Sequence, residues 1–133
     1  MEYINKFFAL KFTNKKQATF CLFIMWLTCF FISIFFAAHR YNMSVISIFT
    51  EHMYDLLPAI IFLPIAFLEL IFDLAPFLEN SMILLYFVFI AFLIIAHVKI
   101  IAKHSVQLFA LLFAVLLTLS YHWIYTALEL SGV

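Results

Sequence analysis

The sequence predicts an all-α integral membrane protein that folds as a small bundle of four membrane helices. Of its 133 residues, 68% are hydrophobic and only 11% are charged, whereas soluble proteins are roughly 45–50% apolar and about 25% charged. Several uncharged stretches are also long enough to cross a bilayer. The length suits a single membrane domain over residues 1–133. These observations exclude a soluble enzyme, a disordered linker and a disulfide-stapled secreted domain.

The first 38 residues predict a basic amphipathic segment followed by a first span. Residues 1–17 place lysines among aromatic side chains, which is typical of a segment lying on a membrane surface. Residues 18–38 are 21 consecutive uncharged residues, enough to cross a hydrocarbon core of about 30 Å at about 1.5 Å per residue. The run is too long for a cleavable signal peptide and lacks a small-x-small cleavage site, so we expect it to be retained.

Residues 39–55 predict a polar connection that lies at the membrane interface. Charged and polar side chains alternate there with apolar ones. The apolar residues recur at a spacing compatible with an amphipathic helix: Val45, Ile46, Phe49, Met53, Leu56 and Leu57.

Residues 56–78 are apolar enough to insert, but they contain Glu69, Asp73 and three prolines. Their fifteen Leu, Ile and Phe residues contribute about −4.5 to −9 kcal/mol on the insertion scale, and the two acids cost up to about 5 to 7 kcal/mol. The prolines add a further cost unless neighbouring helices satisfy the carbonyls that they free. The segment is therefore near break-even, either a second span or a Pro-broken re-entrant or interfacial segment.

Two further spans follow, at residues 81–98 and 105–128. Lys99 and Lys103 end the first of them and can extend toward the head groups. Only a few residues around Lys103 and His104 join the two spans, which predicts a tight antiparallel hairpin. An aromatic cluster near the end of the last span is typical of a membrane interface: Tyr121, Trp123 and Tyr125.

The positive-inside rule and the hydropathy favour different topologies. Both topologies have the amino terminus in the cytoplasm, because four lysines precede the first span and only Arg40 follows it directly. Four crossings put four Lys and Arg residues inside and three outside, whereas three crossings put six inside and one outside, so the rule favours three. A 23-residue apolar stretch normally spans, however, and we therefore predict four crossings, with the loop at Lys103 and His104 outside. The alternative is three spanning helices plus the Pro-broken segment.

The acidic residues are the main candidate for a site. Five of the seven acids lie between residues 51 and 79, where there is no Lys or Arg: Glu51, Asp55, Glu69, Asp73 and Glu79. Glu69 and Asp73 are four residues apart and share one helix face. Because a carboxylate in hydrocarbon is costly, the pair is a candidate for binding a proton, a cation or a basic group of a partner. The alternative is ordinary hydrogen bonding inside the bundle, to His97, Thr118, Ser120 or Tyr121, or a position shallow enough for water to reach the two acids.

No other pattern indicates catalysis, a metal or a cofactor. Cys21 and Cys29 are eight apart in one apolar run and predict buried thiols, with acylation of Cys21 as the alternative. His97 and His122 lie at different depths of the hairpin and cannot ligate one haem. A three-histidine metal site is the weaker alternative to interfacial hydrogen bonds: His39, His52 and His122. No nucleophile–base pattern is present, so we predict no enzyme and no cofactor.

The function predicted is helix–helix binding within the membrane. The protein acts either as an accessory subunit of a membrane complex or as an immunity-type inhibitor of a pore-forming toxin. The rival hypothesis is a small oligomeric proton- or cation-coupled transporter or channel that uses Glu69 and Asp73. The expected partners are the lipid bilayer and another membrane protein or a second copy, and not nucleic acid, since the net charge is zero. The expected location is a cell membrane, the bacterial inner membrane in particular, with several crossings.

Overall fold

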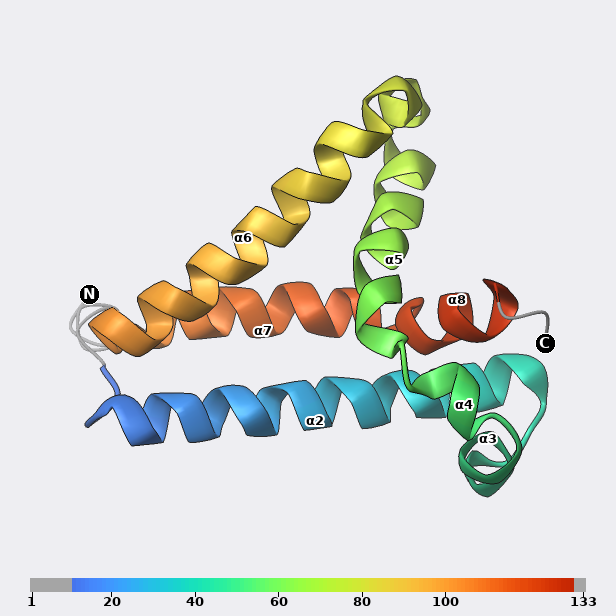
Figure 1. The fold of residues 1–133 in the computed structure, drawn as a ribbon, viewed down its shortest axis with the longest axis horizontal. Coiled ribbons are helices and arrows are strands. Elements are labelled where there is room, and N and C mark those ends of the chain that lie inside the picture. The colour runs from blue at the N-terminus through green and yellow to red at the C-terminus, as the bar shows by residue number, and fades with distance from the viewer. Residues whose placement is uncertain (1–10, 131–133) are drawn as a thin grey trace, which may run out of the picture.

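The computed structural model describes residues 11–130, and these residues are almost entirely helical (Figure 1). The described part contains no strand, only one isolated bridge between Lys11 and Ser105. The helices are, in order, α2 (Lys15–Tyr41), α3 (Val45–Glu51), α4 (Met53–Leu56), α5 (Ala59–Leu74), the 3-10 helix η1 (Pro76–Ser81), α6 (Met82–Lys103), α7 (Val106–Ser120) and α8 (Trp123–Leu130). Most of the predicted amphipathic segment 1–17 lies outside the described residues.

The first span is contained in α2, a helix of 27 residues. The Asn14 side chain caps its start by accepting from the backbone N–H of Gln17, and Asn42 ends it in the left-handed conformation with φ 57°. An amide side chain at each end follows the preference of Asn for N-caps and for left-handed positions. At about 1.5 Å per residue the helix is about 40 Å long, so it extends beyond the predicted range 18–38 toward both interfaces.

The predicted polar connection contains the short helices α3 and α4. Ser44 caps α3 by accepting from the N–H of Ser47, as expected for a serine at an N-cap. The chain then turns at His52 into the four-residue α4. Figure 1 shows both helices beside the carboxyl-terminal end of α2.

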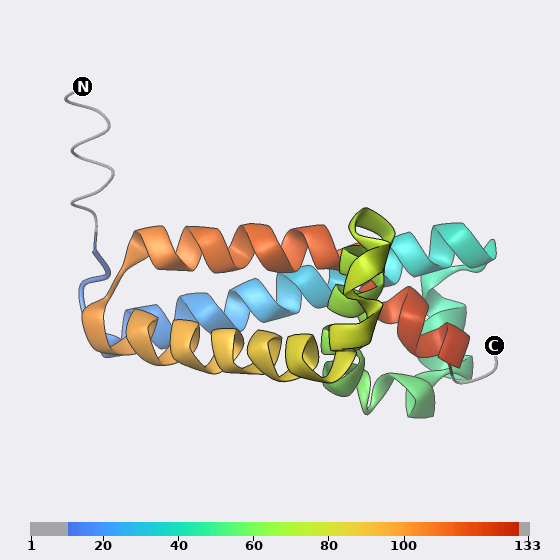
Figure 2. The same ribbon diagram turned by 90° about the horizontal axis from the view of Figure 1, so that it is seen from above.

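The ambiguous stretch 56–78 is divided between the last residue of α4, the helix α5 and the start of η1. Pro58 precedes α5, Pro64 lies inside it, and Pro76 opens η1. With 16 residues, α5 is about 24 Å long, shorter than a hydrocarbon core of about 30 Å. It lies across the direction of α2 in both Figure 1 and Figure 2.

The two predicted spans of the hairpin are α6 and the pair α7 and α8. Ser105 caps α7 by accepting from the N–H of Leu108, and His104 takes the left-handed turn position with φ 56°. The second arm of the hairpin is not one straight helix, because α7 and α8 meet at an angle of 42°. Polar and aromatic residues, Tyr121 and His122, occupy the break.

The protein is thus an all-helical, multi-span membrane protein with fewer long spans than the four helices predicted. Within the described residues, Lys15–Tyr41 and Pro76–Lys103 are long and apolar enough to cross a membrane. Val106–Ser120 and Trp123–Leu130 add a third if the bent pair is one span. Because the prolines divide the stretch 56–78, α5 does not reach that length.

The start of α2 and the connection between α6 and α7 lie at the same end of the molecule. The backbone N–H of Phe12 donates to the carbonyl of His104 at 2.9 Å, and the Phe12 ring contacts Phe109 with centroids 5.4 Å apart. In Figures 1 and 2, α2 and α7 run side by side in the same direction, and α6 returns in the opposite direction. In a topology with four crossings Phe12 and His104 would lie on opposite sides of the membrane, whereas in this structure the two residues are in contact.

The core lies where α2 packs against α7 and α8. Its fully buried side chains come from one face of each helix: Met25, Cys29, Ile34, Leu112, Leu116, Leu119, Ile124 and Leu128. Cys29 is completely buried, whereas Cys21 is half-buried. Leu63 of α5 and Ile100 of α6 also belong to this core. The α5–α6 arm, defined here as residues 69–88, contains no buried residue and extends away from the core with η1 at its tip (Figure 1).

Candidate functional site

Two hydrogen bonds join α2 to the broken helix α7–α8. In the first, the Ser120 hydroxyl on α7 lies 3.2 Å from the carbonyl oxygen of Cys29 on α2. The same hydroxyl also donates to the carbonyl of Leu116 in its own helix at 2.7 Å. The backbone N–H of Ile124 donates to the Ser33 hydroxyl at 2.8 Å. Both interhelical pairs are separated by 91 residues, the constant offset expected of helices that run in the same direction.

The bond from Ile124 explains how the break between α7 and α8 is tolerated. The first N–H groups of a helix lack partners inside that helix, and Ile124 is the second residue of α8. Its N–H and Ser33 are both fully buried, where an unpaired donor is costly. Ser33 therefore acts as an N-cap supplied by another helix.

A second polar contact joins α2 to α6 through Trp26 and His97. The indole Nε1 donates to His97 Nε2 at 2.7 Å, and the two rings stack with centroids 5.7 Å apart. An indole N–H can only donate, so Nε2 is unprotonated and Nδ1 carries the hydrogen that bonds the carbonyl of Leu93 at 2.6 Å. Both ring nitrogens of the neutral imidazole are therefore engaged in the bundle.

Trp123 connects the same cluster to α5. Its indole Nε1 donates to the carbonyl of Ala59 at 2.7 Å, at the start of α5. Its ring makes edge contacts with Trp26 and Phe30, with centroids 5.9 and 5.7 Å apart. One aromatic cluster thus holds α2, α5, α6 and α8 together.

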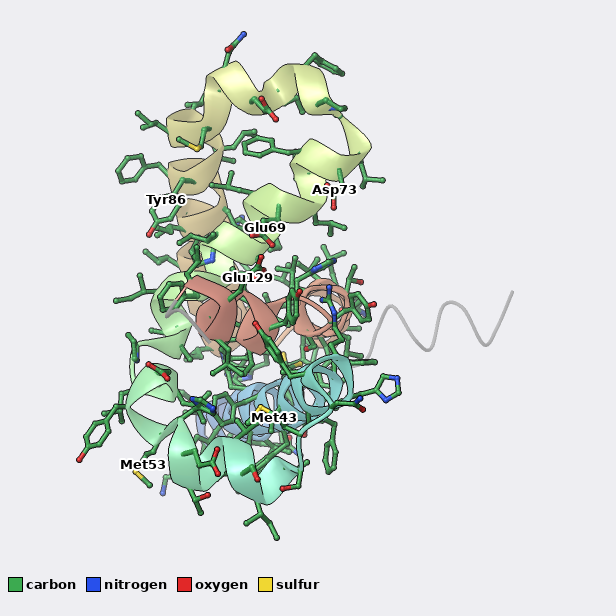
Figure 3. All side chains as sticks on the ribbon, turned by 90° about the vertical axis from the view of Figure 1, so that its right-hand side faces the viewer. Met43, Met53, Glu69, Asp73, Tyr86 and Glu129 are labelled. Atoms are coloured by element: carbon green, nitrogen blue, oxygen red, sulfur yellow. The ribbon has the colours of Figure 1, made fainter. Side chains whose placement is uncertain are left out.

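Of the predicted acidic pair, Glu69 lies against α8. Its Oε2 atom accepts from the hydroxyl of Thr126 at 3.0 Å, and Thr126 is fully buried while Glu69 is half-buried. Figure 3 shows Glu69 on the side of α5 that faces α8. Thr126 is none of the four hydrogen-bond partners that the sequence analysis considered for Glu69. It lies on α8, after the bend that separates α8 from α7.

Asp73 lies one turn farther along α5 and is exposed (Figure 3). Within residues 11–130 the structure gives it no hydrogen bond and no ion pair. The two carboxylates share a helix face, as the spacing predicts, but the structure does not join them in one bonded site. Glu129, three residues after Thr126 on α8, is a further exposed acid near this face.

The acids of this region have no basic partner in the described part of the chain. The one ion pair there is local, between His52 Nδ1 and Asp55 Oδ2 at 3.3 Å. No three His, Cys, Asp or Glu side chains among the described residues gather as a metal site would require. The three-histidine site considered in the sequence is therefore not formed within these residues.

Arg40 is a contact that the sequence reasoning missed. Its guanidinium carbon lies 3.4 Å from the ring centroid of Tyr125 and 4.7 Å from that of Tyr121, and Nη1 lies 3.4 Å from the carbonyl of Tyr121. Cation–π contacts of this kind hold a cation without a carboxylate. The sequence contains a pattern that could have indicated this contact, because a lone arginine ends the first span and an aromatic cluster ends the last one.

The site therefore offers two properties: polar contacts that fix helices against one another, and carboxylates on the α5–α6 arm without a counter-charge. Neither property supplies the paired nucleophile and base that covalent catalysis requires. No protein-family model, no curated protein and no solved structure matches this chain.

Proposed function

We propose that the protein is a non-catalytic membrane protein with three crossings that acts by binding another membrane protein within the bilayer. It serves as an accessory subunit of a membrane complex or as an immunity-type inhibitor of a pore-forming toxin. The proposed location is a bacterial inner membrane, with the amino terminus in the cytoplasm. The observation that carries the proposal is the α5–α6 arm, an apolar projection that bears the unpaired Asp73.

The distribution of basic residues supports three crossings. Lys15 and Lys16 begin α2, and Lys99 and Lys103 end α6, so the contact between Phe12 and His104 brings the four lysines to one end. Arg40 lies at the other end of α2. Basic residues near span ends are retained in the cytoplasm, which assigns the lysine end to that side. α2, α6 and the bent pair α7–α8 are then the crossings.

The exposed surface of the arm supports a binding role. In the apolar stretch of Pro76–Lys103 only 11% of the residues are buried against the rest of the chain, compared with 33% for the apolar stretch of α2. Lipid can cover such a surface, so exposure alone does not imply a partner. Helices associate in lipid through close packing and polar contacts, and Asp73 offers a polar contact that no described residue of this chain uses.

Crosslinking from the arm tests this proposal. A photoreactive residue at Phe87 on α6 is compared with one at Phe35 on α2, since both side chains are 62% exposed. We expect a discrete adduct with a different membrane protein from Phe87 only, and Asp73→Asn should reduce its yield. Adducts only with lipid, or equal yields at the two positions, would contradict the proposal. An adduct of two copies of this chain would instead favour the rival function.

The rival function is an oligomeric proton- or cation-coupled transporter or channel. It is supported by the half-buried Glu69 carboxylate, which a buried Thr126 hydroxyl orients and which no basic residue of the described part of the chain neutralises. Ionisable groups within a membrane commonly mark ion pathways. Proteoliposomes containing a pH-sensitive dye test it: proton flux that disappears in Glu69→Gln supports this function, and the absence of flux with folded protein rejects it.

A further inference from the structure

The lysine end of the molecule contains two hollows that share one side chain, Lys15. One hollow, of about 470 Å³, lies between the start of α2 and the end of α6 and is lined by Lys15, Val98, Ile101, Ala102 and His104. The other, of about 650 Å³, lies along α2 and is lined by Lys15, Lys16, Thr19, Phe20 and Phe23. Volumes of about 300–1,000 Å³ are typical of sites for small molecules.

Each hollow combines a cationic mouth with apolar walls. Lys15 and Lys16 lie in the first turn of α2, whereas Phe20 and Phe23 lie farther along it, toward the middle of the span. On α6, Val98 and Ile101 form the corresponding apolar wall. A ligand that fits both hollows therefore carries its charge at one end and two apolar chains that extend into the membrane.

Within residues 11–130, no carboxylate forms an ion pair with the lysines of this end. The sequence has no Asp or Glu from residue 11 to residue 50, nor from residue 80 to residue 128, and these stretches include all of α2, α6 and α7. Lys11, Lys99 and Lys103 add further positive charge at the same end. Basic pockets between membrane helices on the cytoplasmic side are typical binding sites of anionic lipid head groups.

We propose that the two hollows bind one anionic diacyl phospholipid. Its phosphate lies between Lys15 and Lys16, and its two acyl chains occupy the two hollows on either side of Lys15. A free phosphate ion would use the lysines but leave the apolar walls empty, so the lipid is the source of the phosphate that the site fits. This inference is independent of the arm and its partner, because it concerns the opposite part of α6.

Lipid retention by the full chain in neutral detergent tests the site. Native mass spectrometry compares phosphatidylglycerol with phosphatidylcholine of the same acyl chains. We expect one phosphatidylglycerol bound in clear preference. Lys15→Gln should reduce its retention by about fivefold, the factor that corresponds to about 1 kcal/mol for one lysine at a head group. Equal retention of the two lipids would overturn the proposal.

Lys99→Gln is the matched control, because it removes the same charge from the same end at an exposed residue that lines neither hollow. We expect it to reduce retention clearly less than Lys15→Gln does, because its side chain lines neither hollow and the charge of an exposed side chain is screened by salt. Equal losses in Lys15→Gln and Lys99→Gln would replace the site by a diffuse basic surface.

Two further measurements separate the lipid from its parts. Ile101→Trp fills the hollow between α2 and α6 without a change of charge, and we expect it to lower phosphatidylglycerol retention while the helix content by circular dichroism stays unchanged. Inorganic phosphate added in excess should displace little lipid. Full displacement by phosphate, or undiminished retention in a folded Ile101→Trp, would show that the acyl chains contribute nothing and would overturn the proposal.

Discussion

At the scale of single residues, the Trp26–His97 pair shows how two polar groups are satisfied between helices of the bundle. The indole donates to Nε2 and the imidazole donates to a backbone carbonyl, so each hydrogen has one acceptor. The sequence placed His97 within a span but could not identify its partner, which lies 71 residues away. Such a pairing depends on the packing of α2 against α6, and local patterns carry no information about it.

We expect Trp26 and His97 to be energetically coupled. In a double-mutant cycle of Trp26→Phe and His97→Phe, the coupling should be roughly 0.6 to 1.7 kcal/mol, the range measured for hydrogen bonds between membrane helices. Reversible unfolding in mixed micelles measures it. The pair Trp26 and Thr118 is the control, because Thr118 is exposed and bonds its own helix at Ala114. A coupling near zero for His97 would remove the bond as a source of stability.

Ser33 provides a second prediction at this scale. Ser33→Ala leaves the buried N–H of Ile124 without an acceptor, and loss of a serine cap or of a buried partner costs about 1 to 2 kcal/mol. The free energy of unfolding should fall by that amount. Thr118→Ala serves again as the comparison and should lower it by much less, since its hydroxyl bonds a carbonyl of its own helix. Equal effects in the two variants would show that Ser33 does not cap α8.

At the scale of elements, the long uncharged runs and the proline breaks were predictable, but the bend in the last span was not. The predicted ranges 18–38 and 81–98 lie within α2 and almost entirely within α6, because hydrophobic length is a property of the local sequence. The bend between α7 and α8 has no proline or glycine to mark it, and its freed N–H is satisfied from α2. Thr126 was missed as the partner of Glu69 for the same reason.

The contact between α5 and α8 leads to a third prediction. Glu69→Gln keeps an oxygen that can accept from Thr126, whereas Glu69→Ala removes it. We expect the free energy of unfolding to fall by about 1 kcal/mol in the alanine variant and by little in the glutamine variant.

If the carboxylate charge is used by a partner or an ion, Glu69→Gln with Asp73→Asn should abolish function at normal abundance. Normal function of the double variant would leave helix packing as the only role of the acids.

At the scale of the whole molecule, the proposed topology depends on the transverse position of α5. Hydropathy counted an apolar stretch of 23 residues as a crossing, but Pro58 precedes α5 and Pro76 follows it, and the helix between them has 16 residues. The charge rule, which favoured three crossings, agrees with the contact between Phe12 and His104. The proposed three crossings therefore rest on a tertiary contact, whereas hydropathy alone predicted four.

Cysteine labelling provides the fourth prediction. In a chain without Cys21 and Cys29, new thiols replacing Lys11 and Lys103 should both be protected from an impermeant reagent in intact cells, because the proposed three crossings place both in the cytoplasm. A thiol replacing Asn42, which ends α2 at the opposite end, should be labelled. Labelling at Lys103 together with protection at Lys11 would restore four crossings. Membrane permeabilisation supplies the positive control for each position.

The Ser33 hydroxyl also constrains biogenesis. Ribosomes add about 5 to 20 residues per second, so the 91 residues between Ser33 and Ile124 take roughly 5 to 20 s to be synthesised. During that time α2 resides in the membrane with a polar group directed at a partner that does not yet exist. The bond that caps α8 therefore forms only after α2 and all the helices between have been synthesised, which makes it a late step in the folding of the chain.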